Sequence, residues 1–263
     1  MEDTKKIELE DCARALRIQV LEMIHRAQTS HIGSNFSVID MAVSLYDILK
    51  PDDIVIWSAG WKAATIYALE VQRGNVKEEA LTMFPAAPYF GLAEREAGVI
   101  TCGGSMGHGL PVAVGMALAR KLSGNTSKVY CIMSDGEMNE GTTWEAAMFA
   151  AHHELSNLTV MIDENGWQAM GRTKDVMNQG SLKMKWLAFD WEASDVNGHE
   201  HVCLQRALTW PKVFPHRPTA LICRTVKGRG VSFLEDKIIW HYRHVDDETF
   251  NNAMKELCPE RLS

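Results

Sequence analysis

The chain has 263 residues, of which 46% are hydrophobic and 23% charged, a composition that fits one large α/β domain with a substantial core. A formal net charge of −7 and the absence of any run of lysine or arginine argue against a nucleic-acid-binding protein. The longest apolar stretches are interrupted by glycine or charged residues, so the sequence predicts no membrane-spanning segment.

Cysteine usage and the amino terminus both point to a reducing compartment. Six cysteines, at positions 12, 102, 131, 203, 223 and 258, occur without a Cys-x-x-Cys pair, which argues against a zinc site. Cys131 and Cys223 lie in apolar runs, where a free thiol packs as a small hydrophobe. Residues 1–6 lead directly into an amphipathic helix and show no signal peptide. We therefore expect reduced cysteines and a cytoplasmic protein.

Hydrophobic periodicity predicts helices and strands that alternate along the chain. Apolar residues at helical spacing predict a helix over 9–27, and Ser37 with Asp40 resembles a capping box that would start a helix running through Tyr46. The polar stretch 171–185 predicts a mobile loop over the active site. The other expected elements are strands over 53–57, 128–133, 158–162, 191–196 and 218–225, and helices over 143–155, 202–210, from 246 onward and from the Gly-rich stretch 103–109 to 122. This order predicts a single α/β domain over 1–263, with a mostly parallel sheet flanked by helices.

Two of the predicted strands end in polar residues that are suited to a metal ion. The strand over 128–133 stops at Ser134, Asp135 and Gly136, and the strand over 158–162 is followed by Asn165. A right-handed strand–helix–strand unit brings both strand ends to the same edge of a parallel sheet. A carboxylate and an amide oxygen at that edge suit a hard cation, Mg²⁺ or Ca²⁺, that holds a diphosphate. The alternative interpretation is that Asp-Gly and Asn-Gly are only turn sequences after strands.

The pair resembles the thiamine diphosphate signature, in which Gly-Asp-Gly is followed by Asn about thirty residues later. Asp135 and Asn165 are thirty positions apart, and Ser134 replaces the first glycine with another small residue. The resemblance implies thiamine diphosphate as cofactor and a metal held by Asp135, Asn165 and the backbone carbonyl of Trp167.

Further segments resemble the transketolase family in the same order along the chain. Thr29–Gly33 is similar to the family's Ser-Gly-His-Pro-Gly, and Gly104–Leu110 is similar to its second cofactor loop. Glu137–Gly141 with Glu145 is similar to a segment whose glutamates sit at the dimer contact, and Val196–His199 is similar to Val-Asp-Gly-His. Thr225–Gly230, followed by Trp240 and His241, is similar to Thr-Val-Lys-Gly-Lys-Gly and Trp-His-Gly. The chain is identified as similar to the N-terminal, diphosphate-binding subunit of a split transketolase.

The resemblance assigns expected roles to individual residues. His31, His108 and His241 are expected to be catalytic, because a neutral imidazole can exchange protons with substrate hydroxyls at neutral pH. The expected cofactor-binding residues are Gly104, Ser105, Met106, Gly136, Glu137, Asn165 and His241. Lys227 has two possible roles, contact with an anionic end of the substrate or a solvated position beside a Gly-rich turn.

One segment departs from the family pattern. Residues 58–62 read Ser-Ala-Gly-Trp-Lys, whereas the family has Ser-Lys-Gly-His-Ala, so Trp61 takes the place of a histidine that contacts substrate and cofactor. An indole cannot act as an acid or a base, and its bulk would narrow the pocket. We therefore expect a specialised ketol transfer rather than the ordinary pentose phosphate reaction.

The resemblance also implies an assembly. No pyrimidine-binding domain follows within the 263 residues, so a C-terminal transketolase subunit is expected to supply it in an α2β2 heterotetramer that acts on sugars or sugar phosphates. Two alternatives stay open at this point. One is the α subunit of a 2-oxo acid dehydrogenase, and the other is a non-catalytic scaffold that binds the cofactor and regulates a true transketolase.

Overall fold

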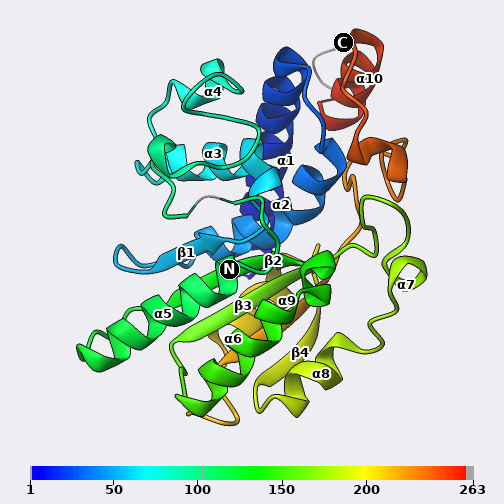
Figure 1. The fold of residues 1–263 in the computed structure, drawn as a ribbon. Helices are drawn as coiled ribbons and strands as arrows, with labels where there is room; N and C mark the ends of the chain where they lie inside the picture. Colours follow the sequence, from blue (N-terminus) through cyan, green and yellow to red (C-terminus); the bar gives the residue numbers. More distant parts are fainter. Residues whose placement is uncertain (1, 102, 259–263) are drawn as a thin grey trace.

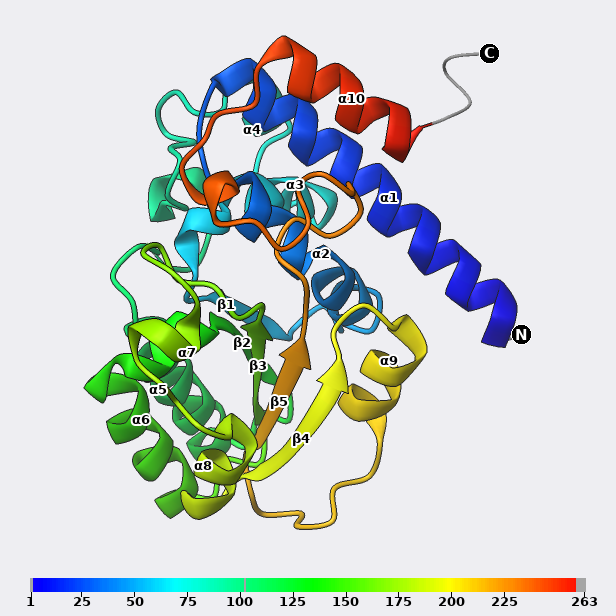
Figure 2. The ribbon, with the colours of Figure 1, turned by 90° about the vertical axis from the view of Figure 1, so that its right-hand side faces the viewer.

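The centre of the molecule is one parallel five-stranded sheet with strand order β1-β2-β3-β5-β4 (Figures 1 and 2). The computed structural model describes residues 2–101 and 103–258, so Met1, Cys102 and the last five residues lie outside it. The strands are β1 (Ile54–Trp57), β2 (Val129–Ser134), β3 (Leu158–Glu164), β4 (Glu192–Asn197) and β5 (Thr219–Arg224). A single α/β domain with a parallel sheet is thus confirmed.

Helices connect and cover these strands. The α-helices are α1 (Glu2–Ala27), α2 (Ile32–Tyr46), α3 (Ala63–Gln72), α4 (Ala80–Met83), α5 (Gly109–Leu122), α6 (Gly141–His152), α7 (Thr173–Val176), α8 (Leu182–Ala188), α9 (His201–Thr209) and α10 (Asp247–Leu257). Four short 3-10 helices are η1 (Gly60–Lys62), η2 (Arg95–Ala97), η3 (Asp135–Asn139) and η4 (Ile238–His241). Within the described ranges, no helix is long and apolar enough to cross a membrane.

Two hydrophobic cores lie on opposite faces of the sheet, and Figure 2 shows the helices that cover each face. Helices α5, α6 and α8 cover one face, whereas α2 and α9 lie on the other, with α1, α3 and α10 packed beyond α2. Along β2, Cys131 and Met133 belong to the core on the face that α5, α6 and α8 cover. Tyr130 and Ile132 belong to the core on the face that α2 and α9 cover. Since both faces are covered, every residue of β2 is buried, which explains its continuous apolar sequence.

The predicted strand–helix–strand unit is present, with α6 as its crossover helix. Strands β2 and β3 pair in parallel, and Ser134 lies opposite Asp163 at their carboxyl ends. Asp135 and Asn165, which follow these strands, therefore meet at one edge of the sheet, as expected for a parallel pair.

Two local predictions were wrong. The second helix begins at Ile32 rather than after Ser37, so Ser37 lies inside α2 and donates a hydrogen bond to Asp163 Oδ2 across 2.7 Å. The stretch 171–185 is not an irregular loop, because it contains α7 and the start of α8. Polar side chains in this stretch, Thr173 and Gln179, bond to Asp135, and a local polarity pattern cannot reveal such distant partners.

Candidate functional site

A cavity of about 340 Å³ lies at the carboxyl edge of the sheet, and we call it the edge cavity. The residues that line it are His31, Ser34, Trp61, Lys62, Leu92, Gly104, Met106, Ser134, Asp135, Gly136, Asn165, Trp167, Gln168, Ala169, Met170 and His241. It therefore brings together most of the residues that the sequence nominated for catalysis, cofactor binding and metal binding. Such an edge is the usual ligand site of open α/β sheets.

Asp135 stands at the start of η3, where β2 ends, and its side chain is almost completely buried. Its Oδ2 accepts hydrogen bonds from Gly166 N at 3.0 Å and from Thr173 Oγ1 at 2.8 Å. Burial is the main reason that its pKa rises to about 7, because a buried carboxylate loses its hydration. Since no lysine or arginine is among the groups that bond to it in the described chain, a bound cation would stabilise its ionised form.

Asn165 and Trp167 continue the same edge. Asn165 Nδ2 donates to Asp163 Oδ2 at 3.1 Å, and Asn165 Oδ1 accepts from Trp167 N at 3.0 Å. A backbone bridge joins Trp167 to Arg172 through Gln168 N and Thr173 N. The carbonyl oxygen of Trp167 takes no part in that bridge, so it stays available as a ligand.

An ion pair that the sequence reasoning missed lies beneath these residues. Lys62 Nζ donates to Asp163 Oδ2 at 2.6 Å and to Ser34 O at 2.8 Å, and both charged side chains are fully buried. Burial by itself would raise the pKa of Asp163, but Lys62, together with hydrogen bonds from Thr225 and Ser37, outweighs it and lowers that pKa. The only sequence signal was a lysine at position 62, where the family pattern has alanine.

His31 and His241 lie side by side in the edge cavity. Their ring centroids are 4.8 Å apart, and His31 N donates to His241 O at 3.1 Å. His31 has a left-handed backbone with φ of 72° at the start of α2. Burial and the charges of Lys227 and Lys62 lower the pKa of His31 to about 4, and they lower the pKa of His241 to about 3. Both imidazoles are therefore neutral near pH 7.

Lys227 fixes the tautomer of His241. Its Nζ lies 2.8 Å from His241 Nδ1 and donates a hydrogen bond to it, since an ammonium group has no acceptor. The solvated position that the sequence left open for Lys227 is wrong, because the side chain is 1% exposed. With Nδ1 acting as acceptor, the ring proton of neutral His241 sits on Nε2, where it can be donated to a ligand.

Other nominated residues lie outside the lining of the edge cavity. His108 is exposed just before α5, with Nδ1 3.1 Å from Met106 O, and Ser105 is exposed in the adjoining loop. Glu137 is fully buried within this chain, where it accepts hydrogen bonds from Ser58 Oγ and from Ser134 N at 3.3 Å. Burial raises the pKa of Glu137 to about 7. Of the glutamates in this segment, Glu137 is thus enclosed within the chain, whereas Glu140 is half-buried and Glu145 is exposed.

A close backbone contact holds the cofactor loop next to Trp61. A Cβ on Gly60 would lie 2.2 Å from the Cα of Gly103, which only two glycines can allow. Trp61 lines both the edge cavity and a second cavity of about 720 Å³, which we call the side cavity, and His31 and Leu92 also line both. The side cavity is lined by Gln28, Thr29, Ser30, His31, Asn35, Trp61, Ala64, Phe84, Phe90, Gly91, Leu92, Glu94, Tyr242 and His244.

The donor set at the edge fits a hard divalent cation that holds a diphosphate. It consists of one carboxylate on Asp135, one amide oxygen on Asn165 and one backbone carbonyl on Trp167, all of them oxygen ligands. No group of three or more His, Cys, Asp or Glu able to hold a metal occurs in the described part of the chain. The ligand set at this edge differs from such a cluster, because it combines one carboxylate with an amide oxygen and a backbone carbonyl.

Comparisons with known proteins support the family resemblance and the fold. The family model described as "Transketolase, thiamine diphosphate binding domain" matches residues 9–258. One of the subunits of the apulose-4-phosphate transketolase of Actinobacillus succinogenes is 33% identical, over 96% of this chain and 97% of its own. The 6-deoxy-6-sulfo-D-fructose transketolase subunit SqwG of a Clostridium species is 31% identical, over 97% of this chain and 98% of its own.

Solved structures show the same likeness at the level of the fold. Transketolase from Campylobacter jejuni superposes with a TM-score of 0.87 and 26% identity, over 95% of this chain but only 42% of that chain. The chain thus spans about two fifths of the solved transketolase. It belongs to the transketolase family, as the thiamine diphosphate-binding domain. It also matches nearly the full length of relatives that are named as separate transketolase subunits.

Proposed function

We propose that this chain is the diphosphate-side half of a thiamine-dependent transketolase that transfers a two-carbon ketol unit between sugars. The observation that carries the proposal is the shared edge cavity, in which neutral His31 and His241 face the same space as Asp135, Asn165 and Trp167. Metal-ligand types and proton-transfer groups at one sheet edge are what such a reaction requires.

The metal would be Mg²⁺ or Ca²⁺, held by Asp135, Asn165 and the carbonyl of Trp167. The loop residues Gly104 and Met106, with Gly136 at the end of β2, border the same cavity and would contact the cofactor. Ser105 and Glu137 do not line the edge cavity, so they would support the cofactor site from beside it. Glu137 would do so through its hydrogen bonds with Ser58 Oγ and Ser134 N. When bound, thiamine diphosphate supplies a carbanion that attacks a carbonyl and then holds the transferred unit.

The chain's own residues orient the substrate and move its protons. His241 carries its proton on Nε2, because Lys227 occupies Nδ1, so it can donate a hydrogen bond to a substrate hydroxyl or to the diphosphate. His31 Nδ1 lies 2.7 Å from Ser30 Oγ, a contact that orients the ring over the cavity. His108 is exposed at the start of α5, and we propose that it meets the cofactor on the side covered by a partner subunit.

A partner subunit of the C-terminal transketolase type would supply the pyrimidine side of the cofactor. The surface of α5 and α6 exposes large apolar side chains, Val112, Leu122, Met148 and Phe149, with Glu145 among them. Apolar residues gathered on neighbouring helices suit a stable protein interface. We propose an α2β2 complex. The described cysteines at 12, 131, 203, 223 and 258 are all free, which favours the cytoplasm as its location.

Sugars or sugar phosphates are the proposed substrates, with Trp61 as a selectivity element. Trp61 borders both the edge cavity and the side cavity, so its indole limits the space that a ketose has between them. Because Trp61 cannot exchange protons, His31 and His241 would carry that task without a third histidine at this position.

The test is reconstitution with a partner chain encoded beside this one. The two chains, separately and mixed, are assayed with thiamine diphosphate, Mg²⁺ and an aldose phosphate as acceptor, and the donors are fructose 6-phosphate and 6-deoxy-6-sulfo-D-fructose. We expect turnover only in the mixture. Turnover by this chain alone would refute the split-site proposal. Metal-dependent cofactor binding with no turnover of any donor would support a non-catalytic scaffold instead.

A further inference from the structure

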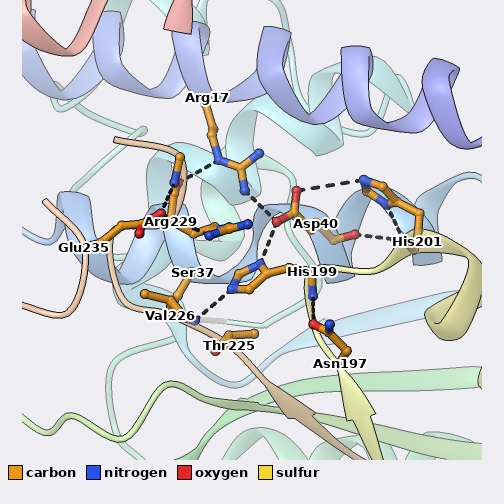
Figure 3. Close-up of polar contacts among 12 residues, drawn as sticks. Arg17, Ser37, Asp40, Asn197, His199, His201, Thr225, Val226, Arg229 and Glu235 are labelled. Carbon is orange, nitrogen blue, oxygen red and sulfur yellow. Dashed lines mark hydrogen bonds and ion pairs between the residues drawn. The ribbon is translucent and has the colours of Figure 1, made fainter. Parts of the chain in front are cut away.

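A buried polar network lies behind the active site, between α1, α2 and the turn after β4 (Figure 3). Asp40 Oδ2 accepts hydrogen bonds from Arg17 at 2.6 Å and from His199 Nδ1 at 2.6 Å. Only 8% of the Asp40 side chain and 10% of the His199 side chain are exposed. Burial by itself would raise the pKa of Asp40, but His199 and Arg17 outweigh it and hold that pKa below its ordinary range. Asp40 is therefore a carboxylate and accepts from both neighbours.

The two nitrogens of His199 have different tasks. Nδ1 must carry a proton to bond to the Asp40 carboxylate, and Nε2 accepts a hydrogen bond from the backbone N–H of Val226 at 2.8 Å. The ring thus lies between Asp40 and the Val226 backbone, as Figure 3 shows. A carboxylate that selects the tautomer of a histidine in this way determines what the far nitrogen can do.

The turn that carries His199 is built to approach this backbone closely. Asn197 Oδ1 accepts from His199 N at 3.0 Å, and Gly198 N donates to Arg224 O at 2.8 Å. A Cβ on Gly198 would lie 2.4 Å from Thr225 Cγ2, so any larger residue would push the turn away. The Val-Asn-Gly-His segment therefore places an imidazole acceptor against the residues that follow β5.

Those residues connect two parts of the active site. On one side of Val226, Thr225 Oγ1 donates to Asp163, the carboxylate that also accepts from Asn165 Nδ2. On the other side, Lys227 Nζ donates to His241 Nδ1 at 2.8 Å. Because His199 Nε2 is the acceptor of Val226 N, the ring fixes the peptide between these two contacts.

We propose that His199 and Asp40 are positioning residues for the transfer reaction, which hold the Val226 peptide and, through it, the Lys227–His241 contact. The inference rests on the proposed function for the role of His241, but the hydrogen bonds themselves are independent of it. A purely structural role is the competing explanation, since the same network also joins α1 to α2 through Arg17 and Asp40.

Three variants separate the two roles. His199→Asn retains a donor for Asp40 but is too short to accept from Val226 N, whereas His199→Gln can place an amide oxygen near the lost Nε2. Ser44→Ala is the matched control, because Ser44 Oγ bonds to His201 Nδ1 at 2.7 Å and to the backbone carbonyl of Asp40 at 2.9 Å, but not to the Asp40 carboxylate or to Val226. His201 Nε2 in turn lies 3.9 Å from Asp40 Oδ1.

The readouts are hydrogen exchange at the Val226 amide, the ¹⁵N shift of His241 Nδ1, and kcat in the complex with the partner subunit, with fructose 6-phosphate as donor. For His199→Asn we expect hydrogen exchange at the Val226 amide to become about tenfold faster, because the amide loses one hydrogen bond. The ¹⁵N shift of His241 Nδ1 should change, and kcat should fall about tenfold. His199→Gln should recover most of each, and Ser44→Ala should leave all three unchanged.

The native chain gives a test that does not depend on any variant folding. A through-bond ¹⁵N–¹⁵N coupling between Val226 N and His199 Nε2 should be measurable, and its absence would overturn the proposal. Equal effects of His199→Asn, His199→Gln and Ser44→Ala would overturn it as well, because they would show general loosening. If the complex proves inactive with every donor, the proposed function fails, but the coupling and the His241 shift still test the positioning role of His199. The two proposals can therefore fail independently of each other.

Discussion

Lys227 donates a hydrogen bond to His241 Nδ1 across 2.8 Å, and a lysine that is 1% exposed thereby becomes part of the proposed active site. Burial lowers the pKa of Lys227 to about 8, and the nearby charge of Lys62 acts in the same direction. The ammonium in turn disfavours a proton on His241, because two adjacent positive charges in a buried site repel each other. The contact with Lys227 thus both fixes the tautomer of His241 and keeps its imidazole neutral.

The lowered histidine pKa values predict the pH behaviour of the site. His31 and His241 should show no titration between pH 5 and pH 8, because their pKa values lie near 4 and 3. Since these values are below the ordinary one of about 6.5, the two residues stabilise the fold above that pH, and the contribution is lost as the pH falls toward 4. Imidazole NMR signals followed against pH check this, with the urea-unfolded chain as control. Titration of either ring near pH 6.5 in the folded chain would contradict it.

Replacing Asp135 should separate metal binding from stability. Asp135→Ala is expected to abolish Mg²⁺-dependent binding of thiamine diphosphate, measured by calorimetry on the assembled complex. It should also lower the free energy of unfolding by about 1–3 kcal/mol, because Thr173 Oγ1 and Gly166 N lose their acceptor. Asp135→Asn is the control, since it keeps an acceptor oxygen and removes the charge. Unchanged cofactor affinity in both variants would exclude Asp135 as a metal ligand.

The ion pair between Lys62 and Asp163 should be important for stability. Lys62→Met leaves the carboxylate of Asp163 buried without its counter-charge and should lower the free energy of unfolding by about 3–5 kcal/mol. The matched control is Lys183→Met, which removes an exposed pair with Asp195 at 3.9 Å and should change stability by less than about 1 kcal/mol. Urea unfolding measures both. Equal losses in the two variants would show that burial of the pair has no special effect.

Replacing Trp61 tests its effect on substrate choice. Trp61→His should broaden the accepted ketoses toward common sugar phosphates, because a smaller ring leaves more space where Trp61 lines the edge cavity and the side cavity. Affinity for thiamine diphosphate should stay the same, since the proposed metal ligands are elsewhere. Turnover of the complex with a panel of ketoses checks the range, and Trp210→His serves as control at an exposed position, where the residue is 71% exposed. An unchanged range would mean that the indole does not limit the substrate.

Apolar periodicity, a local property of the chain, was sufficient to predict the parallel sheet and the crossover between β2 and β3. It failed where residues are determined by distant partners. Ser37 looked like a helix cap because its neighbours fit a capping box, yet it bonds to Asp163, 126 positions away. The stretch 171–185 looked irregular because it is polar, although its polar side chains bond to Asp135.

The α/β fold and the place of Asp135 and Asn165 follow from the order of the residues, because strand order and chain direction bring successive strand ends to one edge. The family resemblance also lies in that order. The buried pair Lys62–Asp163 and the contacts of His199 with Asp40 and Val226 became visible in the folded molecule alone. Each of these joins residues from separate elements, up to 159 positions apart, and a buried charge reveals its partner only after the chain has folded around both.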